Sequence, residues 1–202
     1  MTRIFTKLLL LAIAATLLLC LGCSSEPEVF RSEYFGDLVL KEGDDLDYIY
    51  HDAAVNLRNA TIQVMDFEML APEPEDEADE DDQDDVRWAD AGKRFKEIII
   101  QKATPEIKPK YGIAFTSGGA DYVMKGRILE FNRGSRAARF FVGFGAGSGY
   151  LTFDMKIMDK SGKIVLAAHH KRLAARVYDD LVDLMNDVAD DELPDLFKTI
   201  FK

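Results

Sequence analysis

Two alternating runs of apolar residues near the C-terminal end restrict the fold more than any other feature of this chain. Between them lies Asp159-Lys160-Ser161-Gly162, which contains the residue types that form tight turns. The alternating apolar positions are Leu151, Phe153, Met155 and Ile157 in the first run and Ile164, Leu166 and Ala168 in the second. Period-two alternation is typical of strands with one buried face. Residues 149–159 and 163–177 are therefore predicted to form an antiparallel hairpin.

The rest of the chain adds both helices and strands. Apolar residues at helical spacing predict helices over residues 45–58 and 86–102, and a C-terminal helix that Pro194 should kink or restart. Pro105 and Pro109 should close the second of these helices and lead into a loop over residues 111–119. Alternation predicts strands over residues 60–69 and 121–131. The order α-β-α-β-β-β-α indicates an α+β domain, an antiparallel or mixed sheet with helices packed on one face.

Residues 73–85 form an acidic run in which only Pro74, Ala78 and Gln83 are not acidic. Such a segment cannot bury apolar area, and like charges repel, so we expect a solvated, disordered loop. It lacks the spaced Asp, Gly and bidentate Glu of an EF-hand, so we do not expect a calcium site there.

The N-terminus has the pattern of an export signal. Arg3 and Lys7 precede a run without charges from Leu8 to Leu21, and Gly22-Cys23 follows as a small-residue cleavage site. A membrane-spanning helix needs about 20 apolar residues, and Ser24 ends this run too early.

The segment Cys20-Leu21-Gly22-Cys23 resembles the lipobox of bacterial lipoproteins. The resemblance implies that residues 1–22 are removed and that Cys23 is acylated, with several acyl chains giving stable membrane attachment. Ser24 after the cysteine favours the outer membrane, with the domain facing the periplasm. Cys20 is lost with the signal, so no disulfide is expected. The expected organisation is a tether over residues 23–44 and one domain over residues 45–202.

Composition excludes several functions. The net charge is −11, and loss of the signal, which contains two basic residues and no acidic one, makes it −13. Nucleic-acid binding is therefore not expected. The three histidines are His51, His169 and His170, and the adjacent pair should point to opposite faces of a strand, so we expect no metal site and no cofactor. No serine has the flanking glycines of a nucleophile elbow, so we expect no enzyme.

One block stands out in the C-terminal half. The chain contains Gly126-Arg127-Ile128, then Gly134-Ser135-Arg136-Ala137-Ala138-Arg139, and then glycines at every second position from Gly143 to Gly149. Over roughly residues 60–177 the chain resembles a family of uncharacterised Gram-negative lipoproteins with a single domain of unknown function. That family is in turn distantly similar in its element order to the periplasmic domain of the curli secretion lipoprotein and to the N-terminal domain of the Tol-system β-propeller protein. This second similarity carries little functional weight.

Three interpretations of residues 140–149 remain open. A phosphate-binding glycine loop is the weakest, because no Lys-Ser or Lys-Thr follows and the block leads into a strand. The block can also be a long connection whose glycines allow close packing and positive φ angles. The third interpretation is a contact surface for lipid or another subunit. Its candidate residues are Phe140, Phe141, Phe144, Arg136 and Arg139.

The sequence thus favours a membrane-anchored envelope lipoprotein that acts as a non-enzymatic scaffold or assembly partner. Its expected partners are the membrane, through Cys23, and another envelope protein or a second copy of itself. The alternative is a module that binds a lipid or small ligand, which would require a deep apolar pocket.

Overall fold

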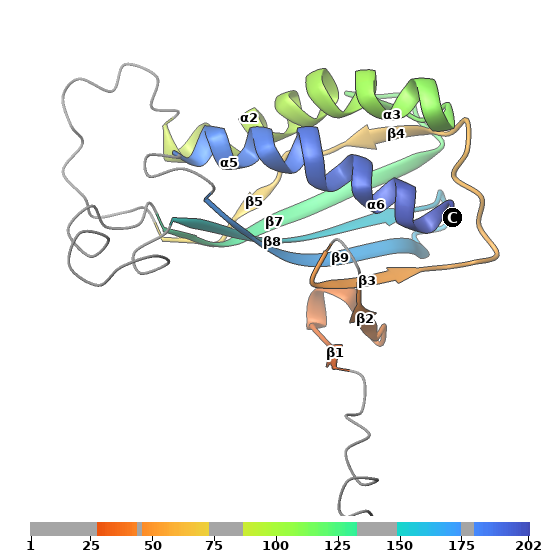
Figure 1. Cartoon of the computed structure of the whole chain (residues 1–202), viewed down its shortest axis with the longest axis horizontal. Coiled ribbons are helices and arrows are strands. Elements are labelled where there is room, and N and C mark those ends of the chain that lie inside the picture. Colours follow the sequence, from red (N-terminus) through yellow and green to blue (C-terminus); the bar gives the residue numbers. More distant parts are fainter. Residues whose placement is uncertain (1–27, 44–45, 73–86, 133–148, 175–179) are drawn as a thin grey trace, which may run out of the picture.

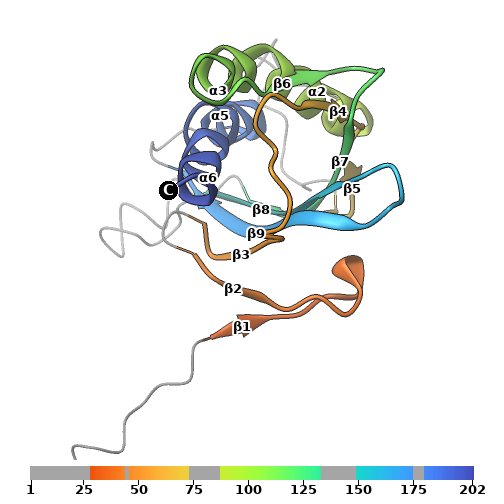
Figure 2. The same cartoon turned by 90° about the vertical axis from the view of Figure 1, so that its right-hand side faces the viewer.

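The computed structural model describes residues 28–43, 46–72, 87–132, 149–174 and 180–202. These form a mixed sheet with two long helical segments on one face, so the expected α+β class is confirmed (Figure 1). A shorter segment at the N-terminal end covers part of the opposite face (Figure 2). The layers are therefore helices, sheet and N-terminal segment.

The strand order in the described part of the sheet is β1-β2-β3-β9-β8-β7-β4-β6, and β5 pairs with β7 beside β4. The bounds are β1 Val29–Phe30, β2 Leu40–Glu42, β3 Tyr48–His51, β4 Thr61–Val64, β5 Glu68–Met69, β6 Ala114–Thr116, β7 Tyr122–Asn132, β8 Tyr150–Met158 and β9 Ile164–Leu173. The β1-β2-β3-β9-β8-β7 part is antiparallel, whereas β4 and β5 run parallel to β7. The long strands β7, β8 and β9 form the centre on which the other elements pack.

The predicted hairpin is confirmed in β8 and β9. Phe153 pairs with His170, and Met155 pairs with Ala168. In the turn, the Asp159 carboxylate accepts hydrogen bonds from the backbone N–H groups of Ser161 and Lys163 at 2.8 and 3.0 Å. Gly162 has a φ of 86°, which favours glycine. Local turn chemistry and alternation thus determine this element.

The first helical segment is longer than expected, whereas the second spans the residues whose spacing predicted it. The first comprises η2 Trp88–Asp90, α2 Ala91–Ile98, a π-helical stretch η3 Ile99–Ala103 and α3 Thr104–Tyr111, and the second comprises α5 Leu181–Asp187, a π-helical stretch η4 Val188–Glu192 and α6 Leu193–Ile200. The prediction that Pro105 ends the first helix was wrong. Pro105 and Pro194 each lie in the first turn after a π-helical stretch, where the hydrogen-bond register changes and a missing N–H donor is tolerated. The expected loop over residues 111–119 contains strand β6.

The main core lies between the helices and the sheet. Its large buried side chains include Phe95, Phe153 and Phe197, each at most 1% exposed. Phe67 lies in this core between two glycines. A Cβ atom added to Gly92 would lie 1.8 Å from the Phe67 carbonyl oxygen, and one added to Gly126 would lie 2.0 Å from the Phe67 ring. The Gly126-Arg127-Ile128 motif therefore has a physical basis, because only glycine leaves room for this ring.

Two expectations for the N-terminal part were wrong. The described part of the expected helix over residues 45–58, residues 46–58, is not helical and contains β3, whose residues Tyr48–His51 pair with β9. A tether was expected over residues 23–44, yet residues 28–43 form β1, the 3-10 turn η1 Glu33–Phe35 and β2 of the domain. Phe35 and Leu40 are 1% and 0% exposed and pack on Ala167 of β9. We call residues 28–43 the N-terminal strap.

Candidate functional site

The residues singled out from the sequence lie outside the described ranges. Cys23, the acidic run 73–85 and Phe140, Phe141, Phe144, Arg136 and Arg139 all belong to segments that the structure does not describe. The structure does describe the two strands that flank the glycine-aromatic block, since β7 ends at Asn132 and β8 begins at Tyr150. The surroundings of the block can therefore be described from these strand ends.

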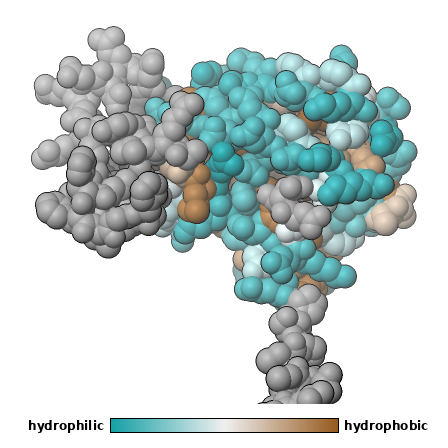
Figure 3. Space-filling view, in the orientation of Figure 1, coloured by the Kyte–Doolittle hydropathy of each residue, from teal (hydrophilic) through white to brown (hydrophobic). Residues whose placement is uncertain are grey.

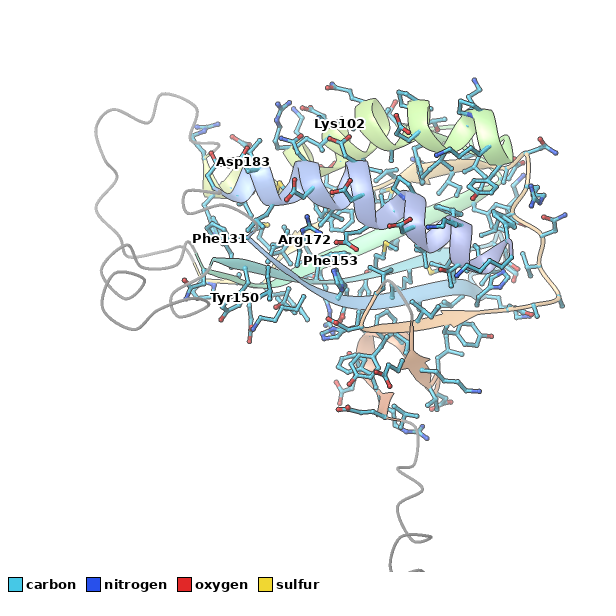
Figure 4. All side chains as sticks on the ribbon, in the orientation of Figure 1. Lys102, Phe131, Tyr150, Phe153, Arg172 and Asp183 are labelled. Atoms are coloured by element: carbon cyan, nitrogen blue, oxygen red, sulfur yellow. The ribbon has the colours of Figure 1, made fainter. Side chains whose placement is uncertain are left out.

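Four aromatic and apolar side chains lie at this end of the sheet, Tyr150 and Leu173 on the face opposite the helices and Trp88 and Phe131 on the face that packs against the main core. Asn132 pairs with Tyr150, which pairs in turn with Leu173. The Trp88 ring lies 5.8 Å from the Phe131 ring, and Leu173 is 58% exposed. We call Trp88, Phe131, Tyr150 and Leu173 the aromatic sheet end (Phe131 and Tyr150 are labelled in Figure 4). The described face visible in Figure 3 is largely hydrophilic, with small apolar patches scattered over it.

A second cluster lies on the sheet face opposite the helices. Asp154 is 0% exposed, and its carboxylate accepts hydrogen bonds from Arg127 Nε at 2.9 Å and Nη2 at 2.7 Å. The other carboxylate oxygen lies 2.7 Å from His169 Nδ1. The strap covers this group, since Phe30 stacks on the His169 ring with centroids 4.0 Å apart and Ser32 Oγ accepts a hydrogen bond from Arg127. The cluster therefore joins the strap to β7, β8 and β9.

Tyr34 of the strap contacts two cations of the same face. Lys156 Nζ donates a 2.6 Å hydrogen bond to the Tyr34 carbonyl and lies 3.7 Å from the centroid of its ring, and the Arg127 guanidinium lies 4.3 Å from that centroid. Burial raises the pKa of the Tyr34 hydroxyl to about 12, and burial lowers the pKa of Lys156 because the charged ammonium loses hydration. These contacts hold the strap through cation–π attraction and a charged hydrogen bond.

A third cluster connects β9 to the π-helical stretch η4. Arg172 donates to the carboxylates of Glu192 and Asp187, the latter at 3.1 Å, and His170 Nε2 lies 3.6 Å from Glu192. Burial raises the pKa of Glu192, but the nearby His170 and the charge and hydrogen bond of Arg172 outweigh burial, so the pKa is lowered. Figure 4 shows Arg172 between the sheet and the helices. This network joins the helical layer to the sheet.

The prediction for the adjacent histidines is confirmed. His169 belongs to the cluster under the strap, whereas His170 faces η4 on the opposite side of the sheet.

Within the described ranges, no group of three His, Cys, Asp or Glu side chains is placed to hold a metal ion. None of the helices in those ranges combines the length and apolar character needed to cross a bilayer.

An open polar depression of about 480 Å³ lies at the other end of the sheet. Its lining comes from the loops around Asn56, Tyr122 and the hairpin turn at Lys160. Asp121 lines it too, but its carboxylate already accepts hydrogen bonds from the backbone and side chain of Thr61. A lipid-binding module needs an enclosed apolar cavity, and this depression is neither enclosed nor apolar.

The clusters that hold the strap and η4 were not found from the sequence. Asp154 and Arg127 stand at positions of alternating strands that would face solvent if nothing covered them. A weak signal was available, because a single acidic residue in β8 and basic residues at matching positions of the neighbouring strand are typical of a cross-strand ion pair.

Comparison with known proteins identifies the family. Residues 62–177 match the family described as Domain of unknown function (DUF4410), so the chain belongs to that family. This confirms the resemblance seen in the sequence. No curated protein matches the chain.

Solved structures resemble the chain only distantly. The dodecamer of PelC from Paraburkholderia phytofirmans in space group P6 is 15% identical, with a TM-score of 0.46, and the match covers 72% of this chain and 96% of that one. A dodecamer of a point variant of the same protein, in space group C2, gives a TM-score of 0.46 at 15% identity, over 73% and 93% of the two chains. A crystal structure of an uncharacterized protein gives 0.45 at 11% identity, over 75% and 96%.

Proposed function

We propose that this protein is an envelope lipoprotein, anchored by acylated Cys23 to the periplasmic side of the outer membrane, that acts as a non-enzymatic scaffold or assembly partner. The mature chain begins at Cys23 in this proposal, and its single α+β domain binds another envelope protein or a second copy of itself. The contact surface comprises the aromatic sheet end and the adjoining block 140–149.

The observation that carries this proposal is the exposure of Leu173 at the end of the sheet where the block joins it. Leu173 is 58% exposed beside Tyr150, and on the other face of the same end the partly buried Trp88 and Phe131 rings contact each other and pack against the main core. Phe140, Phe141 and Phe144 follow within twelve residues of Asn132, the last residue of β7. Aromatic residues are enriched at protein interfaces because they bury large areas at a small cost in conformational entropy.

The charged clusters support a structural role instead of catalysis. His169 stacks on Phe30 and is hydrogen-bonded to a carboxylate that also binds Arg127, so the pair secures the strap. Arg172 and Glu192 similarly connect the sheet to η4. The described part of the chain gives no positive indication of a reaction.

Crosslinking in intact cells tests the proposal. A photoreactive amino acid at Leu173 or Phe141 should capture one defined protein or a second copy of this chain. The same group at Met65, which is 39% exposed but lies near the opposite end of β7, is the matched control and should capture much less. Capture of lipid at Leu173 and Phe141 would favour the ligand-binding alternative, and equal capture at all three positions would refute a contact surface at the sheet end.

A mutational test separates contact from core. In the soluble domain without its acyl group, Phe141→Ser with Phe144→Ser should leave the denaturant midpoint nearly unchanged and weaken self-association or partner binding. If the two rings are core residues instead, each truncation should cost about 3 kcal/mol or more. A collapsed midpoint with unaltered association would show that the block only connects the strands.

A further inference from the structure

The chain enters the domain on the sheet face that lies opposite the helices. Glu28 is the first described residue, and β1 follows it at once. β1 pairs with β2, and β2 pairs with β3. Figures 1 and 2 show this strap beneath the sheet, with both helical segments on the other side. The attachment point of any N-terminal anchor is therefore on a defined face.

The strap is held firmly enough to define that attachment point. Phe35 and Leu40 are fully buried against Ala167. Ser32 and Tyr34 contact Arg127 of β7, so the strap reaches across the sheet from β3 to β7. A domain held in this way cannot turn freely about Glu28 while the strap stays docked.

The chain between Cys23 and Glu28 is short. Five residues span at most about 18 Å, even when fully extended. The outer surface of the helices lies roughly 25 Å from the strap, given layer spacings near 10 Å and a helix radius near 5 Å. If the helices lay against the membrane, Glu28 would be too far from the lipid for Cys23 to reach it.

The charge of the strap does not by itself draw this face to the membrane. The exposed charged residues of the strap are of both signs, namely Glu28, Arg31, Glu33, Asp37, Lys41 and Glu42. Their sum is slightly negative, so an anionic lipid surface does not attract this face. The acyl chains on Cys23 must then attach the protein to the membrane, and the short segment between Cys23 and Glu28 must determine which face of the domain lies against the lipid.

We infer that the strap face of the domain rests against the lipid surface and that the helices point away from it, which leaves the aromatic sheet end directed along the membrane. This inference rests on the proposed acylation of Cys23. It assigns the strap a role as the membrane-proximal layer, and it makes the sheet end accessible to partners anchored on the same membrane.

Fluorescence quenching by labelled lipid tests the orientation. The acylated protein carrying either Asp37→Cys in the strap or Lys108→Cys in α3 would be labelled with a thiol-reactive fluorophore, since both side chains are exposed and acylated Cys23 does not react. The protein would be placed in vesicles of phosphatidylethanolamine and phosphatidylglycerol with nitroxide-labelled headgroups. We expect at least severalfold stronger quenching at position 37 than at position 108. Equal quenching, or stronger quenching at position 108, overturns the inference.

A variant with a longer linker tests whether the short segment between Cys23 and Glu28 causes this orientation. Fifteen Gly and Ser residues inserted after Glu26 extend the reach by up to about 50 Å, so the difference between the two positions should largely disappear while the protein stays on the vesicles. A difference that persists shows direct affinity of one face for lipid and overturns the argument from tether length. Protein that does not float with the vesicles and takes up no acyl label indicates instead that the acylation proposal has failed.

Discussion

Replacement of Asp154 by Ala should destabilise the protein strongly. The carboxylate is 0% exposed and receives three close contacts, from two nitrogens of Arg127 at 2.7 and 2.9 Å and from His169 at 2.7 Å. Without it, the partly buried guanidinium of Arg127 loses its carboxylate partner while it stays beside the Tyr34 ring that Lys156 also contacts. Removal of one partner of a buried ion pair costs about 3 to 5 kcal/mol.

That loss is a large share of the total stability, because domains of this kind have a free energy of unfolding of about 5 to 15 kcal/mol. At a urea dependence near 2 kcal/mol per molar, the midpoint should fall by about 2 M. Undocking of the strap would limit the loss, since the cations then regain water. Hydrogen exchange of the strap amides should therefore accelerate more than exchange in β7 and β8.

Urea unfolding followed by circular dichroism is the assay, and a double variant is the matched control. Asp154→Leu combined with Arg127→Met removes both charges and keeps similar volumes, so it should recover most of the loss seen with Asp154→Ala. A loss below about 1 kcal/mol for Asp154→Ala would place this pair among exposed, weak ion pairs. A double variant as unstable as the sum of its single changes would refute the coupling.

Three further changes have expected outcomes. Cys23→Ala should abolish acyl labelling and signal removal by the lipoprotein route, and undiminished labelling of this variant in cells would contradict the assignment. Deletion of residues 73–85 should change the melting temperature little, provided that the remaining linker spans the gap; a large decrease would mean that the acidic run is docked. The carboxylate of Glu192 binds a proton less tightly in the folded than in the unfolded chain, so its stabilisation is present at neutral pH and is lost as pH falls below 4.5. Glu192→Gln should accordingly lower the melting temperature at pH 7 and flatten its decrease on acidification.

The sequence was sufficient to predict those helices and strands that are determined by residues close together along the chain. The β8–β9 hairpin follows from period-two alternation and the Asp159 turn, both contained within residues 149–177. Helix α2 and the C-terminal helical segment follow from helical spacing of apolar residues, although α3 was not expected, and the opposite directions of His169 and His170 follow from strand geometry. The α+β class follows from these elements together.

Residues 45–58 show where local pattern failed. Leu46, Ile49 and Leu57 fit a helical face, but Tyr48–His51 instead pair with β9, more than 110 residues further along the chain. Hydrogen bonds to a long central strand outweigh a helix propensity that differs among ordinary residues by less than about 1 kcal/mol. The pairing partner was not visible from the segment itself.

The sequence by itself determined that a central hairpin exists, that helices cover a sheet, and that a lipobox-like segment precedes the domain. Only the tertiary structure decided that residues 28–43 belong to the domain and that Asp154 is buried. The apolar residues of the strap have no regular spacing, and the surfaces it contacts, at Arg127, Lys156 and Ala167, lie about 90 or more residues away. A polar position in an alternating strand is solvated unless another segment covers it, and which segment covers it depends on packing between parts of the chain that no local pattern connects.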